Sequence, residues 1–182
     1  SAASDVYKRQ ATGIGTQHGG ILVDFNAVKG GIEIIPLDND WQRAAHVYSD
    51  EVLISHRTDA EKGTPKFERG KSLSDHQREM IYISGTAAIR GEESIVTGDV
   101  LVQTEITLEN IQHLIGLEEG REKLPEHSGK LELLRVYLKH EEDAKIVKED
   151  MDKLCPDVPI VYLYADVCRE ELLVEIEGIA YL

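Results

Sequence analysis

Two carboxylates stand inside an otherwise apolar stretch at the end of the chain, LLVEIEGIAYL (172–182). Glu175 and Glu177 are separated by one residue, so both point to the same side of an extended strand. The alternate positions are all apolar or small: Leu172, Val174, Ile176, Gly178 and Ala180. Those positions predict the face that packs on helices, which leaves the two acids on a mixed, half-covered face. Partial desolvation there would raise the pKa of a carboxyl and make it a proton donor near neutral pH.

Cationic side chains in the same part of the chain offer two readings. A salt bridge from Glu175 to Arg135 or Arg169 is the structural alternative to catalysis. Arg135, Tyr137 and Lys139 alternate along one predicted strand and therefore face one way. They form either a solvated sheet face or a cationic, hydrogen-bonding wall for a carboxylated small molecule.

A thiol and a run of small residues are further candidates for a site. Cys168 could act as a nucleophile, but no His stands at a recognisable local spacing, so a small buried residue is the alternative. Small side chains follow a predicted strand in SGTAAIRGEES (84–94): Gly85, Thr86 and Ala87. They permit close backbone approach, either to a neighbouring strand or to a ligand.

Composition excludes several classes of function. The net charge of −14 argues against a nucleic-acid partner, because such proteins neutralise phosphates with clustered Lys and Arg. No segment approaches the about 18 apolar residues of a membrane span. The two cysteines and the scattered histidines have no metal-ligand spacing, so no metal is expected. The glycine-rich GIGTQHG (13–19) precedes a predicted strand instead of following one, which indicates a turn and no dinucleotide cofactor. Without a charged, apolar leader, the chain is expected to be cytoplasmic.

The predicted elements from residue 80 onward alternate between strands and helices. A strand over 80–85 is followed, after a kink or bulge at Gly85, by a possible continuation. Asp99 caps a helix predicted over 99–118. The remaining elements are a strand over 131–139, a shorter helix ending before Pro156, a strand within 158–166 and a last strand within 171–182. This order predicts an α+β fold with one mixed sheet and both helices on one face.

The first third of the chain is different and holds one clear predicted strand, over 21–28. LVDFNAV (22–28) matches LVEIEGI (173–179) in pattern, 151 residues earlier (173 − 22). We therefore expect residues 10–30 to be the tail strand of a preceding, degenerate copy, after an edge segment over 1–9. An unrelated N-terminal strand that joins the sheet is the alternative. Residues 31–79 are expected to be a long connection with one or two short strands, before the main domain over 80–182.

Several motifs resemble the Rid (YjgF/YER057c/UK114) superfamily over about residues 80–182. They are YISGTAAIRGEES, GDVLVQTEITLENIQHLI, LRVYLKHEEDAKIVKEDM and LLVEIEGIAYL. The resemblance implies a chorismate-mutase-like α+β fold, usually a homotrimer with ligand sites in the clefts between subunits. Imine-hydrolysing members carry an Arg fifteen residues before the first Glu of the last strand. Ile160 stands there in this chain, which argues against ordinary 2-iminobutanoate deaminase activity.

SGTAAIRGEES, DVCREELLVEIEG and the upstream GTPKFERG are most similar to the C-terminal half of the chorismatase-like branch. Chorismatases have two Rid-like halves and release pyruvate from chorismate without a cofactor. The resemblance implies that Glu175 protonates the enolpyruvyl methylene and that Cys168 stands where some chorismatases steer product choice. It also suggests holders for two substrate carboxylates: Arg135, Tyr137, Arg169 and the backbone of Gly85, Thr86 and Ala87. A Rid-type deaminase with a rearranged Arg clamp and a non-catalytic small-molecule binder are the alternatives.

Overall fold

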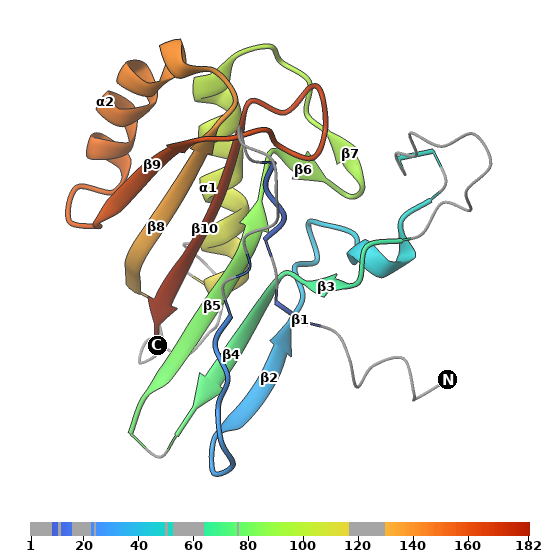
Figure 1. The fold of residues 1–182 in the computed structure, drawn as a ribbon, viewed down its shortest axis with the longest axis vertical. Coiled ribbons are helices and arrows are strands. Elements are labelled where there is room, and N and C mark those ends of the chain that lie inside the picture. Colours follow the sequence, from blue (N-terminus) through green and yellow to red (C-terminus); the bar gives the residue numbers. More distant parts are fainter. Residues whose placement is uncertain are drawn as a thin grey trace.

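A six-stranded mixed sheet forms the centre of the molecule (Figure 1). The structure is a computed structural model and describes residues 9–10, 12–15, 23, 25–49, 51–52, 64–75, 77–116 and 130–182. The strand order is β2 (Glu33–Leu37), β4 (Gly70–Ser74), β5 (Glu79–Thr86), β10 (Val174–Tyr181), β8 (Lys130–Leu138) and β9 (Ile160–Tyr164). Neighbouring strands are antiparallel except β8 and β9, which are parallel.

Two helices, α1 (Val100–Ile115) and α2 (Ala144–Leu154), share one hydrophobic core with the sheet. The Asp99 carboxylate accepts a 2.9 Å hydrogen bond from the Leu101 amide and so caps α1, as the sequence predicts. The helix ends at Ile115 because Gly116 takes a left-handed conformation with φ of 76°. The core members common to the two layers include Ile111, Val147, Met151, Val136 and Ile176. Since both helices belong to this core, they cover one face of the sheet, and the predicted α+β class is confirmed.

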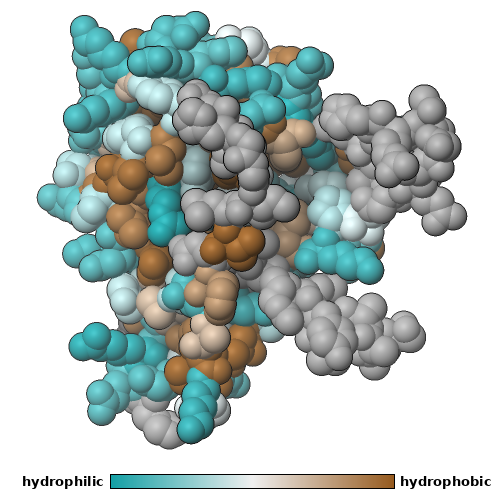
Figure 2. All heavy atoms as spheres, in the orientation of Figure 1, coloured by the Kyte–Doolittle hydropathy of each residue, from teal (hydrophilic) through white to brown (hydrophobic). Residues whose placement is uncertain are grey.

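The central strand β10 follows the predicted alternation. Val174, Ile176 and Ala180 are fully buried toward the helices. Figure 2, drawn from the same side as Figure 1, shows apolar side chains gathering over the sheet among hydrophilic ones. The edge strands contribute exposed apolar residues to the surface: Ile34, Ile35, Val161 and Leu163.

A β-bulge interrupts the pairing of β5 with β10. Ile176 pairs with Thr86 and Gly178 pairs with Ile83, so one residue of β10 lies opposite two residues of β5. The two residues are Ser84 and Gly85, where the sequence predicts a kink or bulge. Bulges of this kind redirect side chains and are frequent beside active sites.

The expected strand over 21–28 is wrong for the part of it that the structure describes. Val23 and residues 25–28 lie in no strand, and Val23 and Phe25 are 71% and 79% exposed. Alternating apolar residues form a strand only where a sheet edge pairs with their backbone, and these residues have none.

The connection before β5 holds more structure than the one or two short strands expected. The described part of 31–79 contains β2, β3 (Phe67–Glu68) and β4, and both β2 and β4 extend the main sheet. The smaller elements are β1 (Arg9–Gln10), which pairs with β3, then β6 (Ile89–Arg90), β7 (Glu93–Ser94) and the short helices η2 (Ala45–Val47) and η3 (Glu141–Asp143).

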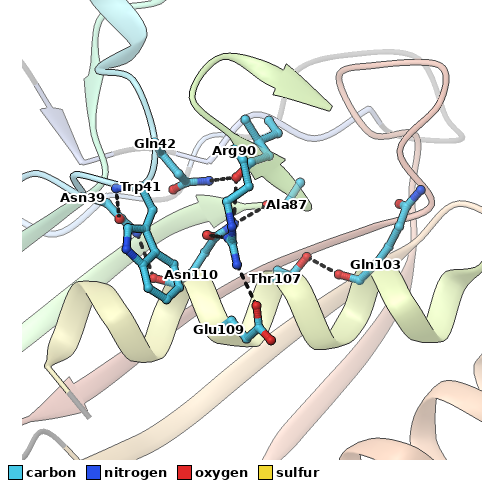
Figure 3. A network of polar contacts seen from close by, with 10 residues as sticks. Asn39, Trp41, Gln42, Ala87, Arg90, Gln103, Thr107, Glu109 and Asn110 are labelled. Carbon is cyan, nitrogen blue, oxygen red and sulfur yellow. Dashed lines mark hydrogen bonds and ion pairs between the residues drawn. The ribbon is translucent and has the colours of Figure 1, made fainter. Parts of the chain in front are cut away.

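Asn39 and Trp41 contact α1 through a hydrogen bond and an aromatic stack (Figure 3). The Trp41 ring stacks on His113 with 3.8 Å between centroids, and the Arg90 guanidinium lies 4.7 Å from the Trp41 centroid. The Asn39 side-chain amide donates a 2.9 Å hydrogen bond to the Asn110 carbonyl. None of the helices in the described ranges is both long and apolar enough to cross a membrane.

Candidate active site

Glu175 is a buried carboxyl in the middle of the sheet. It points away from the helices, as the alternation along β10 requires, yet only 5% of it is exposed. An ideal Cβ built on Gly85 would lie 3.0 Å from Glu175 Cδ, so the glycine of the bulge leaves the space that the carboxyl occupies. Burial, and then the charge of Glu177, raise the pKa of Glu175 to about 7, while Arg69 opposes the rise. This carboxyl can therefore hold a proton near neutral pH.

Glu177, two residues along the same strand, has the opposite electrostatic setting. Its Oε1 accepts hydrogen bonds of 2.7 Å from Arg135 Nη1 and from the Tyr137 hydroxyl. Burial alone would raise the pKa of Glu177, but hydrogen bonds from Thr12, Tyr137 and Arg135 outweigh it and lower the pKa. Glu177 therefore stays ionised, and its charge helps to keep the proton on Glu175.

Arg135 and Tyr137 thus lie at the predicted site but bind an acid of the protein. The register between β8 and β10 places Arg135 opposite Glu177 and Tyr137 opposite Glu175. The salt bridge that the sequence left open for Glu175 is made by Arg135 to Glu177 instead. Lys139, on the same strand, donates through Nζ to the Glu170 carbonyl at 2.7 Å.

The predicted small residues contribute unequally. The Gly85 amide donates a 2.8 Å hydrogen bond to the Thr12 hydroxyl, so the N-terminal segment reaches the acid site. Thr86 is buried and its hydroxyl donates to the Ser84 carbonyl at 2.9 Å. The Ala87 carbonyl accepts from the Asn110 side chain. Of the three, Gly85 is the residue that the structure places against Glu175.

Cys168 lies in the loop that leads into β10 and is exposed at the surface of the chain. Desolvation by the surrounding protein atoms raises the pKa of its thiol, and the nearby charge of Glu175 adds to the rise. The thiol is therefore protonated at neutral pH and is a weak nucleophile. Within the described ranges, no three His, Cys, Asp or Glu side chains are gathered so that they could hold a metal ion.

Two buried arginines approach the site from loops. Arg169 Nη1 donates to the Glu92 carbonyl and to the Ser94 hydroxyl, both at 2.9 Å, and its guanidinium lies 5.6 Å from the Tyr48 ring centroid. Arg69 lies 5.7 Å from the same centroid and is 3% exposed. The two arginines are buried cations beside an aromatic ring, an arrangement that suits an anionic ligand.

Arg69 interacts electrostatically with Glu175, although no local pattern in its motif, GTPKFERG, predicts this. Its positive charge acts to lower the pKa of Glu175, and its Nε is buried without a hydrogen-bond partner among the described residues. The bulge holds its backbone, because the Ser84 amide donates a 3.0 Å hydrogen bond to the Arg69 carbonyl. Because Arg69 lies far from Glu175 along the chain, local spacing does not predict this electrostatic interaction.

Comparisons of the sequence with curated proteins find clear relatives. No protein-family model matches the chain. The chain is 34% identical over 177 residues to a chorismatase of Streptomyces rapamycinicus, an alignment that covers 93% of this chain and 50% of the relative. It is 33% identical over 182 residues to a 3-hydroxybenzoate synthase of Streptomyces hygroscopicus, covering 93% and 49%. The chain therefore spans about half the length of the curated relatives it matches.

Solved structures agree with the sequence relatives. A crystal structure of a chorismatase superposes with a TM-score of 0.65 at 29% sequence identity and covers 81% of this chain and 43% of that one. Yeast Mmf1 superposes with a TM-score of 0.54 at 13% identity and covers 81% and 98%, which shows a shared fold alone.

Proposed function

Because this chain is a chorismatase-like protein with the Rid (YjgF/YER057c/UK114) fold, we propose that it releases pyruvate from chorismate or a similar enol ether without a cofactor. The observation that carries the proposal is the buried Glu175, whose pKa of about 7 lets it hold a proton that an ordinary glutamate would lose. Protonating a vinyl ether carbon requires an acid in a dry site, and burial supplies both conditions.

In the proposed reaction, Glu175 gives its proton to the methylene carbon of the enolpyruvyl group. The carbon next to the ether oxygen becomes an oxocarbenium ion, and the Glu175 and Glu177 carboxylates stabilise this positive charge. Water adds to the cation. The resulting hemiketal then breaks the bond between its central carbon and the ether oxygen, and its hydroxyl proton passes to that oxygen. The products are pyruvate and the ring alcohol, and the proton released by the water returns to Glu175. Capture of the cation by a ring hydroxyl instead of water is the alternative course.

A doubly negative substrate needs at least two cations, and we assign them to Arg69 and Arg169. Both are buried beside Tyr48, and the buried Nε of Arg69 offers a donor that the described residues do not use. Arg135 and Tyr137 keep a place at the site in this proposal, but they hold Glu177 ionised and in position. The single N–H of Gly85 already donates to the Thr12 hydroxyl, so we assign no substrate carboxylate to it.

For Cys168, the resemblance implies a part in choosing the product. Its protonated thiol lies close enough to Glu175 for the carboxylate charge to raise the thiol pKa. One curated relative is a 3-hydroxybenzoate synthase and another is a chorismatase, so related proteins carry different product names. We expect Cys168→Ala to change the ratio of aromatic to non-aromatic ring product, measured by chromatography, more than it changes total pyruvate.

The deciding experiment measures pyruvate release from chorismate with a coupled lactate dehydrogenase assay. Glu175→Gln should lower the rate by about 10²- to 10⁴-fold, the contribution typical of a general acid. Glu132→Gln is the matched control, because Glu132 is an exposed acid on β8. Equal pyruvate release by Glu175→Gln and the unaltered protein would overturn the assignment of the acid.

The deaminase alternative is less well supported by the packing. Ile160, at the position of the missing Arg clamp, begins β9 and packs against the hydrophobic core. Ammonia release from 2-iminobutanoate with no pyruvate release from chorismate would favour that alternative. The homotrimer and the cytoplasmic location remain predictions, and light scattering and cell fractionation test them.

A further inference from the structure

Helix α1 has a second buried face in addition to the one on the sheet. Gln103, Thr107 and Asn110 lie on this second face, and each is 0% exposed. The apolar side chains beside them form a separate small core: Ala87, Ala88, Ile89, Val167 and Leu172, with Ile106 against it. That core belongs to the two loops that flank Glu175, one after β5 and one before β10. Figure 3 shows the Gln103 and Asn110 side chains pointing from α1 toward these loops.

Gln103 holds the loop that leads into β10. Its Oε1 accepts a 2.8 Å hydrogen bond from the Leu173 amide, and its Nε2 donates to the Glu171 carbonyl at 3.0 Å. An amide N–H only donates and a carbonyl only accepts, so the two partners fix the orientation of the side chain without ambiguity. The same loop carries Cys168 and Arg169, and Glu175 follows Leu173 by two residues.

Asn110 holds the loop after β5 in the same way, through hydrogen bonds from its side chain. Two turns along α1 from Gln103, its Nδ2 donates to the carbonyls of Ala87 at 3.0 Å and Ile89 at 3.1 Å. Ala87 follows the Gly85 bulge closely in sequence. One rigid helix therefore sets the position of both loops through two buried amide side chains.

We propose that Gln103 is a positioning residue for the Glu175 site. Its two hydrogen bonds fix Glu171 and Leu173, and through them the Cys168 thiol and the start of the Glu175 strand. An apolar side chain of the same size would fill the space but would leave the partly buried Leu173 amide and Glu171 carbonyl without these hydrogen bonds, so the loop would open or shift. The effect on rate rests on the proposed function, whereas the effect on the loop does not.

The near-isosteric variant Gln103→Met removes both hydrogen bonds. We expect kcat for pyruvate release from chorismate to fall by about 10- to 100-fold, and by more than KM rises, because small misplacements of a reacting group have effects of this size. Thr104→Val is the matched control on the same helix. Thr104 is equally buried, and its hydroxyl donates only within the helix, to the Val100 carbonyl at 2.7 Å. That variant should keep both constants.

Alkylation of Cys168 by iodoacetamide reports the position of the loop without any substrate. Cys168 is exposed, while the other cysteine, Cys155, is 6% exposed, so the folded protein offers one accessible thiol. We expect Gln103→Met to change the alkylation rate of Cys168 by about threefold or more, since a loop that has lost its anchors opens more often. Thr104→Val should leave the rate unchanged.

Gln103→Glu supplies a conservative rescue. A protonated carboxyl offers one donor and one acceptor, as the amide does, whereas an ionised carboxylate offers acceptors only. At about pH 5.5 this variant should alkylate at nearly the same rate as the unaltered protein. At about pH 8 its alkylation rate should differ from that of the unaltered protein by a larger factor than the rate of Gln103→Met does. Gln103→Met should show no such recovery.

The outcomes separate the two proposals. If Gln103→Met lowers the melting temperature but keeps kcat, KM and the alkylation rate, then Gln103 contributes stability only and its positioning role is overturned. The same holds if Gln103→Glu shows no dependence on pH. If the unaltered protein releases no pyruvate, the proposed function fails, while the alkylation series still decides the role of Gln103.

Discussion

Replacing Glu175 by Gln should remove a loss of stability that the protein suffers as the pH rises, and it also removes the proposed acid. The folded protein raises the pKa of Glu175 from 4.5 to about 7, mainly by burial. Between these two values the folded chain holds a proton that the unfolded chain has lost. The unfolded state therefore binds fewer protons, and the free energy of unfolding falls as the pH rises through this window.

The size of the effect follows from the two pKa values. Their difference of about 2.5, at about 1.4 kcal/mol for each pH unit, corresponds to a cost of about 3 kcal/mol once Glu175 is ionised in the folded state. Roughly 2 kcal/mol of this cost develops between about pH 5.5 and about pH 8.5. A neutral amide at this position carries no such cost. Any loss of packing or hydrogen bonding in Glu175→Gln is independent of pH and cancels when the two pH values are compared.

Urea denaturation of both proteins at the two pH values is the assay. The stability of Glu175→Gln relative to the unaltered protein should increase by about 2 kcal/mol from about pH 5.5 to about pH 8.5. Glu177→Gln is the opposing control: the pKa of Glu177 is lowered, so its ionised form stabilises the fold and the variant should be less stable at both pH values. A relative stability of Glu175→Gln that is flat or falls with pH would refute the buried, proton-holding carboxyl.

Three further substitutions test separate parts of the site. Gly85→Ala places a Cβ against the Glu175 carboxyl and should lower pyruvate release by about 100-fold in a steady-state assay, with the fold retained on circular dichroism; a rate within about twofold of normal would contradict the close contact. Arg69→Met keeps the length of a buried side chain but removes its charge, so KM for chorismate should rise by about tenfold or more, whereas a change confined to kcat would argue against a role in substrate binding. Asn110→Asp replaces the donor to two buried carbonyls by an acceptor and should lower the free energy of unfolding by about 3 kcal/mol in urea denaturation; an unchanged midpoint would mean that the loop after β5 is not held there.

The parts of this structure that local patterns determine could be predicted from the sequence. Alternation along β10 shows which side of the strand carries Glu175, the small residue at the end of β5 indicates the bulge, and Asp99 marks the start of α1. Each of these features depends on neighbours a few residues away.

Features that depend on pairing between distant segments could not be predicted in this way. The register of β8 against β10 decides that Arg135 binds Glu177, and no local spacing contains that register. The approach of Arg69 to Glu175 depends on the extra strands of the sheet, which the polar connection over 31–79 conceals. The strand expected over 21–28 fails for the same reason, since an alternating segment needs a partner edge.

The bulge in β5 adds one residue that the pairing of the sheet does not require. The pairs on either side of it, Thr86 with Ile176 and Ile83 with Gly178, would remain in register if one residue were deleted. The sheet is therefore complete without the additional residue. The additional residue interrupts regular pairing but serves the site. The Ser84 amide binds the Arg69 carbonyl, and Gly85 leaves space for the Glu175 carboxyl. A single additional residue in an otherwise regular strand is thus enough to make room for the buried carboxyl of the proposed site.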